Sequence, residues 1–117
     1  MKVRFFIIVL IISVCSGLFA IDMNKIVAYP VPFNPKKQNR ITIGDPSAVL
    51  AGYNVKVEIF DINGDIVLKR HGSQFPVYWN GRNGSGRYVK PGMYIIRVVA
   101  ENDSEYGKKN IRILVNY

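Results

Sequence analysis

Apolar and polar residues alternate along much of the chain with the two-residue period of β-strands. In residues 53–59 the apolar side chains occupy every second position: Tyr53, Val55, Val57 and Ile59. This pattern predicts a strand with one buried face and one face exposed to water. Residues 40–43 alternate in the same way, and Gly44-Asp45-Pro46 ends that strand.

The second half of the chain predicts further strands. Residues 75–79 form a short apolar run, and residues 94–100 are apolar on both faces except at Arg97. A strand with two apolar faces belongs in the middle of a sheet. Residues 101–109 are polar and predict a hairpin loop, after which residues 110–115 predict the closing strand.

Asn63-Gly64 predicts a tight hairpin after the strand at 53–60. We expect a two-residue type I′ turn, because its two central residues need positive φ, which asparagine and glycine tolerate. The register that follows pairs Ile62 with Asp65, Phe60 with Val67, Ile59 with Leu68, and Glu58 with Lys69. The opposite charges of the last pair then face water, while the apolar pair beside it faces the core.

Two segments rich in proline and glycine interrupt the strands. Residues 29–35 contain three prolines, which remove backbone donors and exclude a helix or a central strand. We expect this segment to lie along a sheet edge with Phe33 pointing inward. Residues 79–94 contain four glycines that allow two turns, and the aromatic residues at either end, Trp79 and Tyr94, are predicted to be core residues.

Short strands separated by turn signals, without any helical period after the first twenty residues, indicate an all-β fold. The strand spacing predicts an immunoglobulin/fibronectin III-like sandwich of about seven antiparallel strands. We assign this domain to residues 21–117, which provide enough chain for one domain and not for two.

The first twenty residues have the layout of a secretory signal peptide. A short positive lead is followed by an apolar run at 5–14 and by small residues that suit cleavage after Ala20, or after Gly17 as the second choice. The run is about ten to fifteen residues long, short of the ~20 that span a bilayer. Lipid attachment at Cys15 is a further alternative, because Ile-Ser-Val-Cys loosely resembles a lipobox.

Cleavage after Ala20 leaves an exported domain with a basic surface. It removes two basic residues and the single cysteine, so fourteen basic and eight acidic side chains remain and the formal charge is +6. A domain without a thiol is held together by its core and not by disulfides. We expect it in the periplasm, on the cell surface or outside the cell.

The sequence predicts no catalytic, cofactor-binding or metal-binding residue, and we expect no enzyme. The only histidine, His71, is expected in a solvated loop, and the chain cannot supply several imidazole or thiol ligands. Asp61, Asn63 and Asp65 have the oxygen spacing of a calcium loop, but no acidic residue closes the loop at Gly72. A plain hairpin explains these residues better.

One loop combines positive charge with an aromatic residue. Arg82, Arg87, Tyr88 and Lys90 lie between the predicted strands at 75–79 and 94–100, and form the candidate contact site for a partner or a polyanion. Such a mixture is found in binding sites for single-stranded nucleic acid, but an exported domain rarely meets nucleic acid. A polyanionic envelope polymer is the better alternative ligand.

Three motifs, in this order, resemble a known domain family: Tyr29-Pro30-Val31-Pro32-Phe33-Asn34-Pro35, then Phe60-Asp61-Ile62-Asn63-Gly64, then Trp79-Asn80-Gly81 followed by Gly86, Val89, Gly92 and Tyr94. Together they resemble the immunoglobulin-like domain of the flagellar hook-capping protein FlgD and the related C-terminal sorting domain of proteins exported by type IX secretion. The resemblance runs from about residue 29 to the C-terminus. It implies an immunoglobulin-like module of an exported bacterial protein.

These observations favour a non-enzymatic structural or interaction module. It would dock onto other proteins of the envelope, a flagellum, a secretion assembly or the cell surface through a sheet edge or the 82–90 loop. The alternative is a binding module for an acidic glycan or another envelope polyanion, which the charge of +6 favours. Neither hypothesis needs a cofactor, a nucleic acid or a membrane span.

Overall fold

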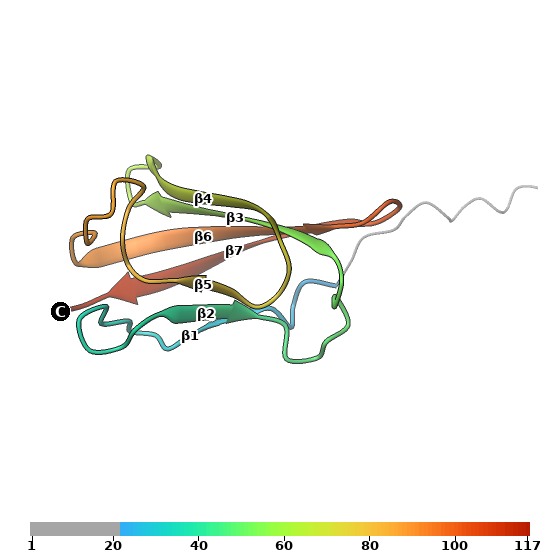
Figure 1. Cartoon of the computed structure of the whole chain (residues 1–117), viewed down its shortest axis with the longest axis horizontal. Coiled ribbons are helices and arrows are strands. Elements are labelled where there is room, and N and C mark those ends of the chain that lie inside the picture. Colours follow the sequence, from blue (N-terminus) through green and yellow to red (C-terminus); the bar gives the residue numbers. More distant parts are fainter. Residues whose placement is uncertain (1–21) are drawn as a thin grey trace, which may run out of the picture.

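The computed structural model describes residues 22–117, and these form two antiparallel β-sheets packed face to face (Figure 1). The strands are β1 (Val27–Tyr29), β2 (Ile41–Gly44), β3 (Asn54–Asp61), β4 (Ile66–Ser73), β5 (Val77–Trp79), β6 (Gly92–Glu101) and β7 (Tyr106–Val115). One sheet has the order β4-β3-β6-β7 and the other β1-β2-β5. Residues 22–117 contain no helix, so the predicted all-β sandwich of seven strands is confirmed.

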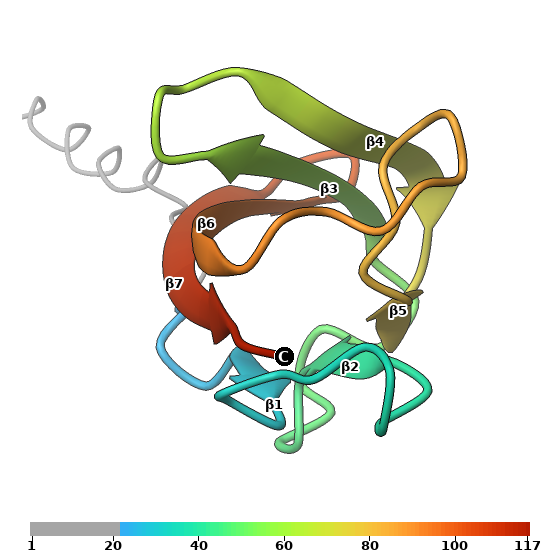
Figure 2. The same ribbon diagram turned by 90° about the vertical axis from the view of Figure 1, so that its left-hand side faces the viewer.

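The core lies between the inward faces of the two sheets, as the alternation predicts (Figure 2). On β3 and β6 the predicted inward residues are buried: Val55, Val57, Ile59, Tyr94, Ile96, Val98 and Ala100. Strand β6 lies between β3 and β7, as its two apolar faces predict. Trp79 is 1% exposed, and the centroids of the Phe33 and Tyr94 rings each lie 6.1 Å from its ring. The two predicted core aromatic residues are therefore core residues.

The β3–β4 hairpin differs from the predicted type I′ turn. Within the turn only Gly64 has positive φ (88°), and the Asp61 amide donates to the Asp65 carbonyl at 2.9 Å. This is a three-residue loop, a type I turn followed by a glycine bulge. The Asp61 carboxylate accepts hydrogen bonds from the Asn63 and Asp65 amides at 2.9 and 3.0 Å, which stabilises this longer loop over the two-residue one.

The predicted register is right in the strands and wrong beside the turn. Ile59 pairs with Leu68 and Glu58 with Lys69, as expected. Phe60 pairs with Ile66 instead of Val67, because the ladder shifts between Ile59 and Phe60. The bulge is at Val67 in β4, which has no ladder partner on β3, and it absorbs one residue without turning the inner face outward.

The proline-rich segment lies along the edge of β7, as predicted. The Phe33 amide donates to the Leu114 carbonyl at 2.8 Å, and the Asn116 amide donates to the Phe33 carbonyl at 2.9 Å. The Phe33 side chain is 0% exposed. A single aromatic side chain thus closes this end of the core, while the prolines around it take no part in a central strand.

Two further expectations need correction. The polar loop predicted at 101–109 is only 102–105, because Glu101 pairs with Tyr106 and the ladder continues beyond the core. There the Asn102 side chain accepts hydrogen bonds from the Ser104 and Glu105 amides, which closes the turn. His71, predicted in a loop, lies on strand β4.

The predicted signal peptide at 1–20 and the lipidation alternative at Cys15 lie outside the described residues. Within residues 22–117 no helix has the length and apolar character that crossing a membrane requires.

Candidate functional site

The loop between β5 and β6, residues 80–91, is folded into a small hairpin of its own. Arg82 and Tyr88 form an antiparallel bridge, and the Asn83 amide donates to the Arg87 carbonyl at 2.8 Å. The Asn83 side-chain oxygen accepts hydrogen bonds at 3.0 Å from the amides of Ser85 and Arg87. The backbone that carries the predicted contact residues is therefore fixed by its own hydrogen bonds.

Core residues hold this loop against the sandwich. The Trp79 indole donates to the Arg82 carbonyl at 2.8 Å, and the Tyr94 hydroxyl donates to the Lys90 carbonyl at 2.6 Å. Gly81, with φ of 81°, lies so close to Pro35 that an added Cβ would be 2.6 Å from the proline Cβ. Only glycine fits this close approach. The loop is thus fixed at both of its ends.

The Tyr94 hydrogen bond has the geometry of an immunoglobulin tyrosine corner. Tyr94 stands near the start of β6 and bonds to a carbonyl four residues upstream. Burial raises the pKa of Tyr94 above its ordinary value of 10.0, and the nearby Asp61 and Tyr117 raise it further. The phenol therefore stays protonated at neutral pH and remains a donor.

Arg82 organises the loop from within. Its guanidinium donates to the Gly86 carbonyl at 3.0 Å and to the Tyr88 hydroxyl at 3.1 Å. It also lies over the Tyr88 ring, with Cζ 4.2 Å from the ring centroid. An arginine with these contacts fixes the position of the tyrosine.

Two residues that the sequence reasoning missed complete the site. The Tyr117 hydroxyl donates to the Val89 carbonyl at 2.6 Å, and its ring centroid lies 6.4 Å from that of Tyr88. The Lys36 ammonium lies 4.7 Å from the centroid of the Tyr117 ring. Tyr117 follows Ile113 and Val115 at the two-residue spacing of side chains on one face of a strand. This spacing is the one sequence signal that could have identified Tyr117.

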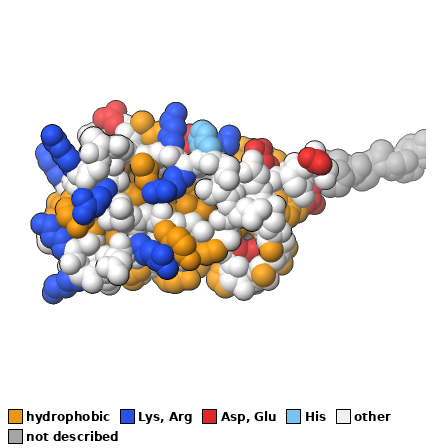
Figure 3. Space-filling model, in the orientation of Figure 1, with side chains coloured by type: hydrophobic (Ala, Val, Ile, Leu, Met, Phe, Trp, Pro, Cys, Tyr) orange, Lys and Arg blue, Asp and Glu red, His pale blue; other side chains and the backbone are white. Residues whose placement is uncertain are grey.

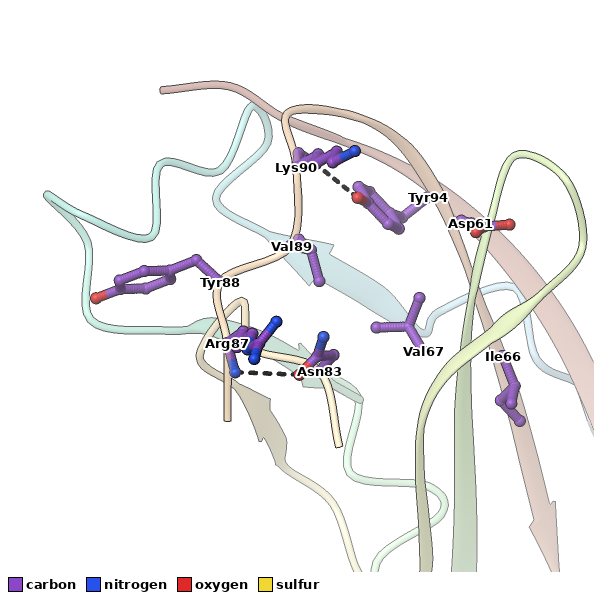
Figure 4. A pocket seen from close by; sticks show the side chains of 9 residues that line it. All are labelled: Asp61, Ile66, Val67, Asn83, Arg87, Tyr88, Val89, Lys90 and Tyr94. Atoms are coloured by element: carbon purple, nitrogen blue, oxygen red, sulfur yellow. Dashed lines mark hydrogen bonds between the residues drawn. The ribbon is translucent and has the colours of Figure 1, made fainter. Parts of the chain in front are cut away.

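We refer to Lys36, Arg82, Arg87, Tyr88, Lys90 and Tyr117 as the basic-aromatic cluster. All four predicted contact residues belong to it, although Arg82 mainly supports Tyr88. Arg87, Tyr88 and Lys90 line an open hollow of about 380 Å³ together with residues of the β3–β4 hairpin and Tyr94 (Figure 4). The structure thus brings the predicted residues together on one surface.

The hollow is predominantly positive. Its one acidic residue, Asp61, uses its carboxylate to hold the β3–β4 turn. Within residues 22–117 the one carboxylate in close contact with basic side chains is Glu58, beside His71 and Arg97, so no carboxylate of this region neutralises Arg87 or Lys90. Lysine and arginine side chains gather at the left of Figure 3, where the 80–91 loop and the C-terminus lie in Figure 1. Such a surface attracts anionic groups.

The sheet edges, the other docking surface expected from the sequence, are poorly suited to strand addition. The ladder between β3 and β4 is irregular between Val55 and Val57, and β4 carries Lys69, Arg70 and His71. Bulges and long charged side chains discourage pairing with a further strand. The start of β4 is also covered, because the Gly84 amide donates to the Val67 carbonyl at 3.1 Å.

Strands β1 and β5 have three residues each, and Phe33 covers the end of β7. Short or covered edges offer few unpaired backbone groups.

Among residues 22–117, no three His, Cys, Asp or Glu side chains lie close enough together to hold a metal ion.

No protein-family model matches the chain, and no curated protein matches it. Among solved structures, the chain is similar to part of PorZ, described as an essential bacterial surface component of the type IX secretion system of Porphyromonas gingivalis. The TM-score is 0.60 at 27% sequence identity, over 79% of this chain and 11% of PorZ. This fold also occurs in type IX secretion proteins.

Two further solved structures are similar to the chain. Latent PorU from P. gingivalis matches at a TM-score of 0.55 and 19% identity, over 77% of this chain and 9% of PorU. FlgD from P. aeruginosa matches at a TM-score of 0.49 and 21% identity, over 76% of this chain and 71% of FlgD. The likeness to PorZ agrees with the part of the resemblance that points to type IX secretion proteins. The chain spans about a tenth of the length of PorZ and PorU.

Proposed function

We propose that this chain is a non-enzymatic, exported module that docks onto proteins of a bacterial envelope or secretion assembly. The likeness to part of PorZ, a surface component of a type IX secretion system, supports the class of assembly. The signal-peptide pattern at 1–20 supports export. PorZ and PorU are much longer than this chain, so the activities of those whole proteins are not attributed to it.

The basic-aromatic cluster is the observation that carries the docking role. Tyr88 is 38% exposed and Tyr117 39% exposed, yet hydrogen bonds hold both of them in place. Aromatic and arginine side chains that are fixed before binding lose little conformational entropy in a complex, and they are common among the residues that dominate interface energies. The partner surface that fits this cluster is acidic and has a concave or flat apolar centre.

This loop surface suits docking better than the sheet edges do. An edge-mediated partner would add a strand through backbone hydrogen bonds, and the bulged, charged β4 strand opposes that arrangement. The cluster instead offers side chains on a fixed backbone. We therefore place the docking surface at the end of the sandwich that carries residues 80–91.

Site-specific photo-crosslinking in the exporting cells tests this role. A photoreactive amino acid replaces Tyr88 in one strain and Tyr106 in a control strain. Tyr106 is 53% exposed and lies at the β6–β7 hairpin. We expect the probe at position 88 to form one discrete crosslink to an envelope or secretion-assembly protein, and the probe at 106 to form none to that protein. Crosslinks of equal yield from both positions would contradict docking through the cluster.

A second candidate function rests on the same positive hollow. Arg87 and Lys90 have no carboxylate partner among residues 22–117, which suits an acidic glycan or another envelope polyanion. Such binding would weaken steeply with added salt. Protein docking that depends on Tyr88 and Tyr117 would weaken less, so the salt dependence of binding separates the two functions.

A further inference from the structure

A second hollow lies between the two edge strands β4 and β5. These strands border the same open side of the sandwich (Figure 2). The hollow has a volume of about 320 Å³ and is lined by Arg70, Ser73, Gln74, Pro76, Val77 and Tyr78. None of these residues belongs to the basic-aromatic cluster. We refer to it as the β4–β5 hollow.

Tyr78 forms the aromatic wall of this hollow. Its neighbours on β5, Val77 and Trp79, point into the core, so Tyr78 points outward and is 37% exposed. The Arg40 guanidinium lies 3.6 Å from the centroid of its ring. Such a close cation stack fixes the ring orientation and covers part of the ring, while the ring also borders the hollow.

The rest of the lining is polar in a particular combination. Arg70 on β4 provides a planar set of donors, and Ser73 and Gln74 provide a hydroxyl and an amide. Neither Arg40 nor Arg70 takes part in an ion pair within residues 22–117. Basic residues beside hydrophobic ones are visible on the face that Figure 3 presents. The hollow thus joins an apolar ring, neutral hydrogen-bonding groups and positive charge.

This combination matches the chemistry of an acidic sugar. A pyranose ring has a C–H face that packs on an aromatic ring and a rim of hydroxyls that suits serine and glutamine. A carboxylate on the sugar suits arginine, whose donors match its two oxygens. An extended peptide fits less well, because the irregular β4 ladder disfavours an added strand.

We propose that the β4–β5 hollow binds a carboxylate-bearing sugar unit of an envelope polysaccharide. The ring of the sugar packs beside Tyr78, and Arg70 binds the carboxylate. Ser73 and Gln74 bind hydroxyl groups at the rim. This inference is independent of the proposed docking role, since the two hollows share no lining residue.

Nuclear magnetic resonance titration of the isotope-labelled exported protein tests the inference. The probe is a short oligogalacturonate, and the matched control is the same oligomer with its carboxylates methyl-esterified. Inorganic sulfate serves as a control for a bare anion. We expect the acid oligomer to shift the amide signals of residues 70–78, and the ester to bind about tenfold more weakly or worse, because a charge-assisted contact is lost.

Two variants locate the site. Tyr78→Ala and Arg70→Gln are each expected to weaken binding about tenfold. Tyr29→Ala, which removes a 52% exposed tyrosine from β1 of the same sheet, is expected to leave binding unchanged. Unchanged spectra elsewhere in each variant establish that the fold is intact.

Three results would overturn the inference: shifts confined to residues 80–91, equal effects of sulfate and oligomer, or no shift at millimolar oligomer. The first of these would favour polyanion binding at the basic-aromatic cluster. None of the three bears on protein docking, which the crosslinks at Tyr88 test separately.

Discussion

The Tyr94 hydroxyl donates a hydrogen bond of 2.6 Å to the carbonyl of Lys90. Tyr94 is a core residue that packs against Trp79, whereas the Lys90 side chain is exposed and lines the positive hollow. One hydrogen bond thus connects the centre of the sandwich to its candidate docking surface. The position of the loop depends on the core, so changes in the core are expected to reach the site.

Tyr94→Phe is expected to lower the free energy of unfolding by about 1 kcal/mol, because the ring is kept and the Lys90 carbonyl loses its donor. Chemical denaturation measures this loss. Tyr106→Phe, at an exposed position, serves as the matched control and should unfold like the unchanged protein. A Tyr94→Phe protein as stable as the control would contradict the role of this hydrogen bond.

Alkaline pH is expected to destabilise the protein through Tyr94. Burial, with Asp61 and Tyr117 nearby, raises the pKa of Tyr94 in the folded state above the ordinary value of 10.0. The neutral phenol is therefore favoured by folding. Its contribution is fully present below the pKa of the unfolded state and is lost as pH rises through the pKa of the folded state.

Urea unfolding at about pH 8 and about pH 10.5 checks this expectation. The unchanged protein should lose more stability between the two pH values than Tyr94→Phe does. If both proteins lose the same free energy of unfolding between these pH values, a group other than Tyr94 causes the loss of stability at alkaline pH.

Gly81→Ala is expected to be more destabilising than Gly86→Ala. Both glycines have positive φ, 81° and 85°, which costs about 1–2 kcal/mol for a residue with a Cβ. At Gly81 the new Cβ would also lie 2.6 Å from the Cβ of Pro35, and overpacking adds about 1–3 kcal/mol. At Gly86 no atom lies within 4 Å of the added Cβ. Comparable melting temperatures of the two variants would contradict the close approach.

Arg82→Lys tests whether Arg82 supports the loop. Lysine keeps the charge but cannot bond to the Gly86 carbonyl and the Tyr88 hydroxyl with the same planar geometry. Hydrogen exchange of the amides at 83–88 is expected to become several-fold faster. Arg87→Lys, whose guanidinium has no such contact, is the control and should leave these rates unchanged. Equal hydrogen-exchange rates at 83–88 in the two variants would contradict a supporting role of Arg82.

The strands could be predicted because burial repeats with period two. Val55, Val57 and Ile59 show this alternation on β3. The same alternation on β6 places Tyr94 in the core. The turn after β3 was harder, because Asn63-Gly64 suits both a two-residue and a three-residue loop. The Asp61 carboxylate decides between them by accepting two amide hydrogen bonds, and this local side-chain contact leaves no mark on the alternation of apolar and polar residues.

The candidate site was predictable only in part. Arg82, Arg87, Tyr88 and Lys90 are neighbours in sequence, and one hairpin gathers them. Lys36 and Tyr117 reach the same surface because residues 30–36 pass beside the end of β7, a tertiary contact that no local pattern encodes. The β4–β5 hollow was also missed, since Arg70 and Tyr78 lie on strands of different sheets.

The most direct test of the docking role compares two charge-reversed proteins in the cells that export them. One protein carries Arg87→Glu and Lys90→Glu in the cluster, and the other carries Lys25→Glu and Lys108→Glu, which are exposed and outside it. Both lose the same charge, so a difference between them reports on position. After mild crosslinking, each protein is recovered with its partners.

We predict that the unchanged protein and the Lys25/Lys108 variant recover the same envelope or secretion-assembly component, and that the Arg87/Lys90 variant does not. Recovery of that component by all three proteins would contradict docking through the basic-aromatic cluster.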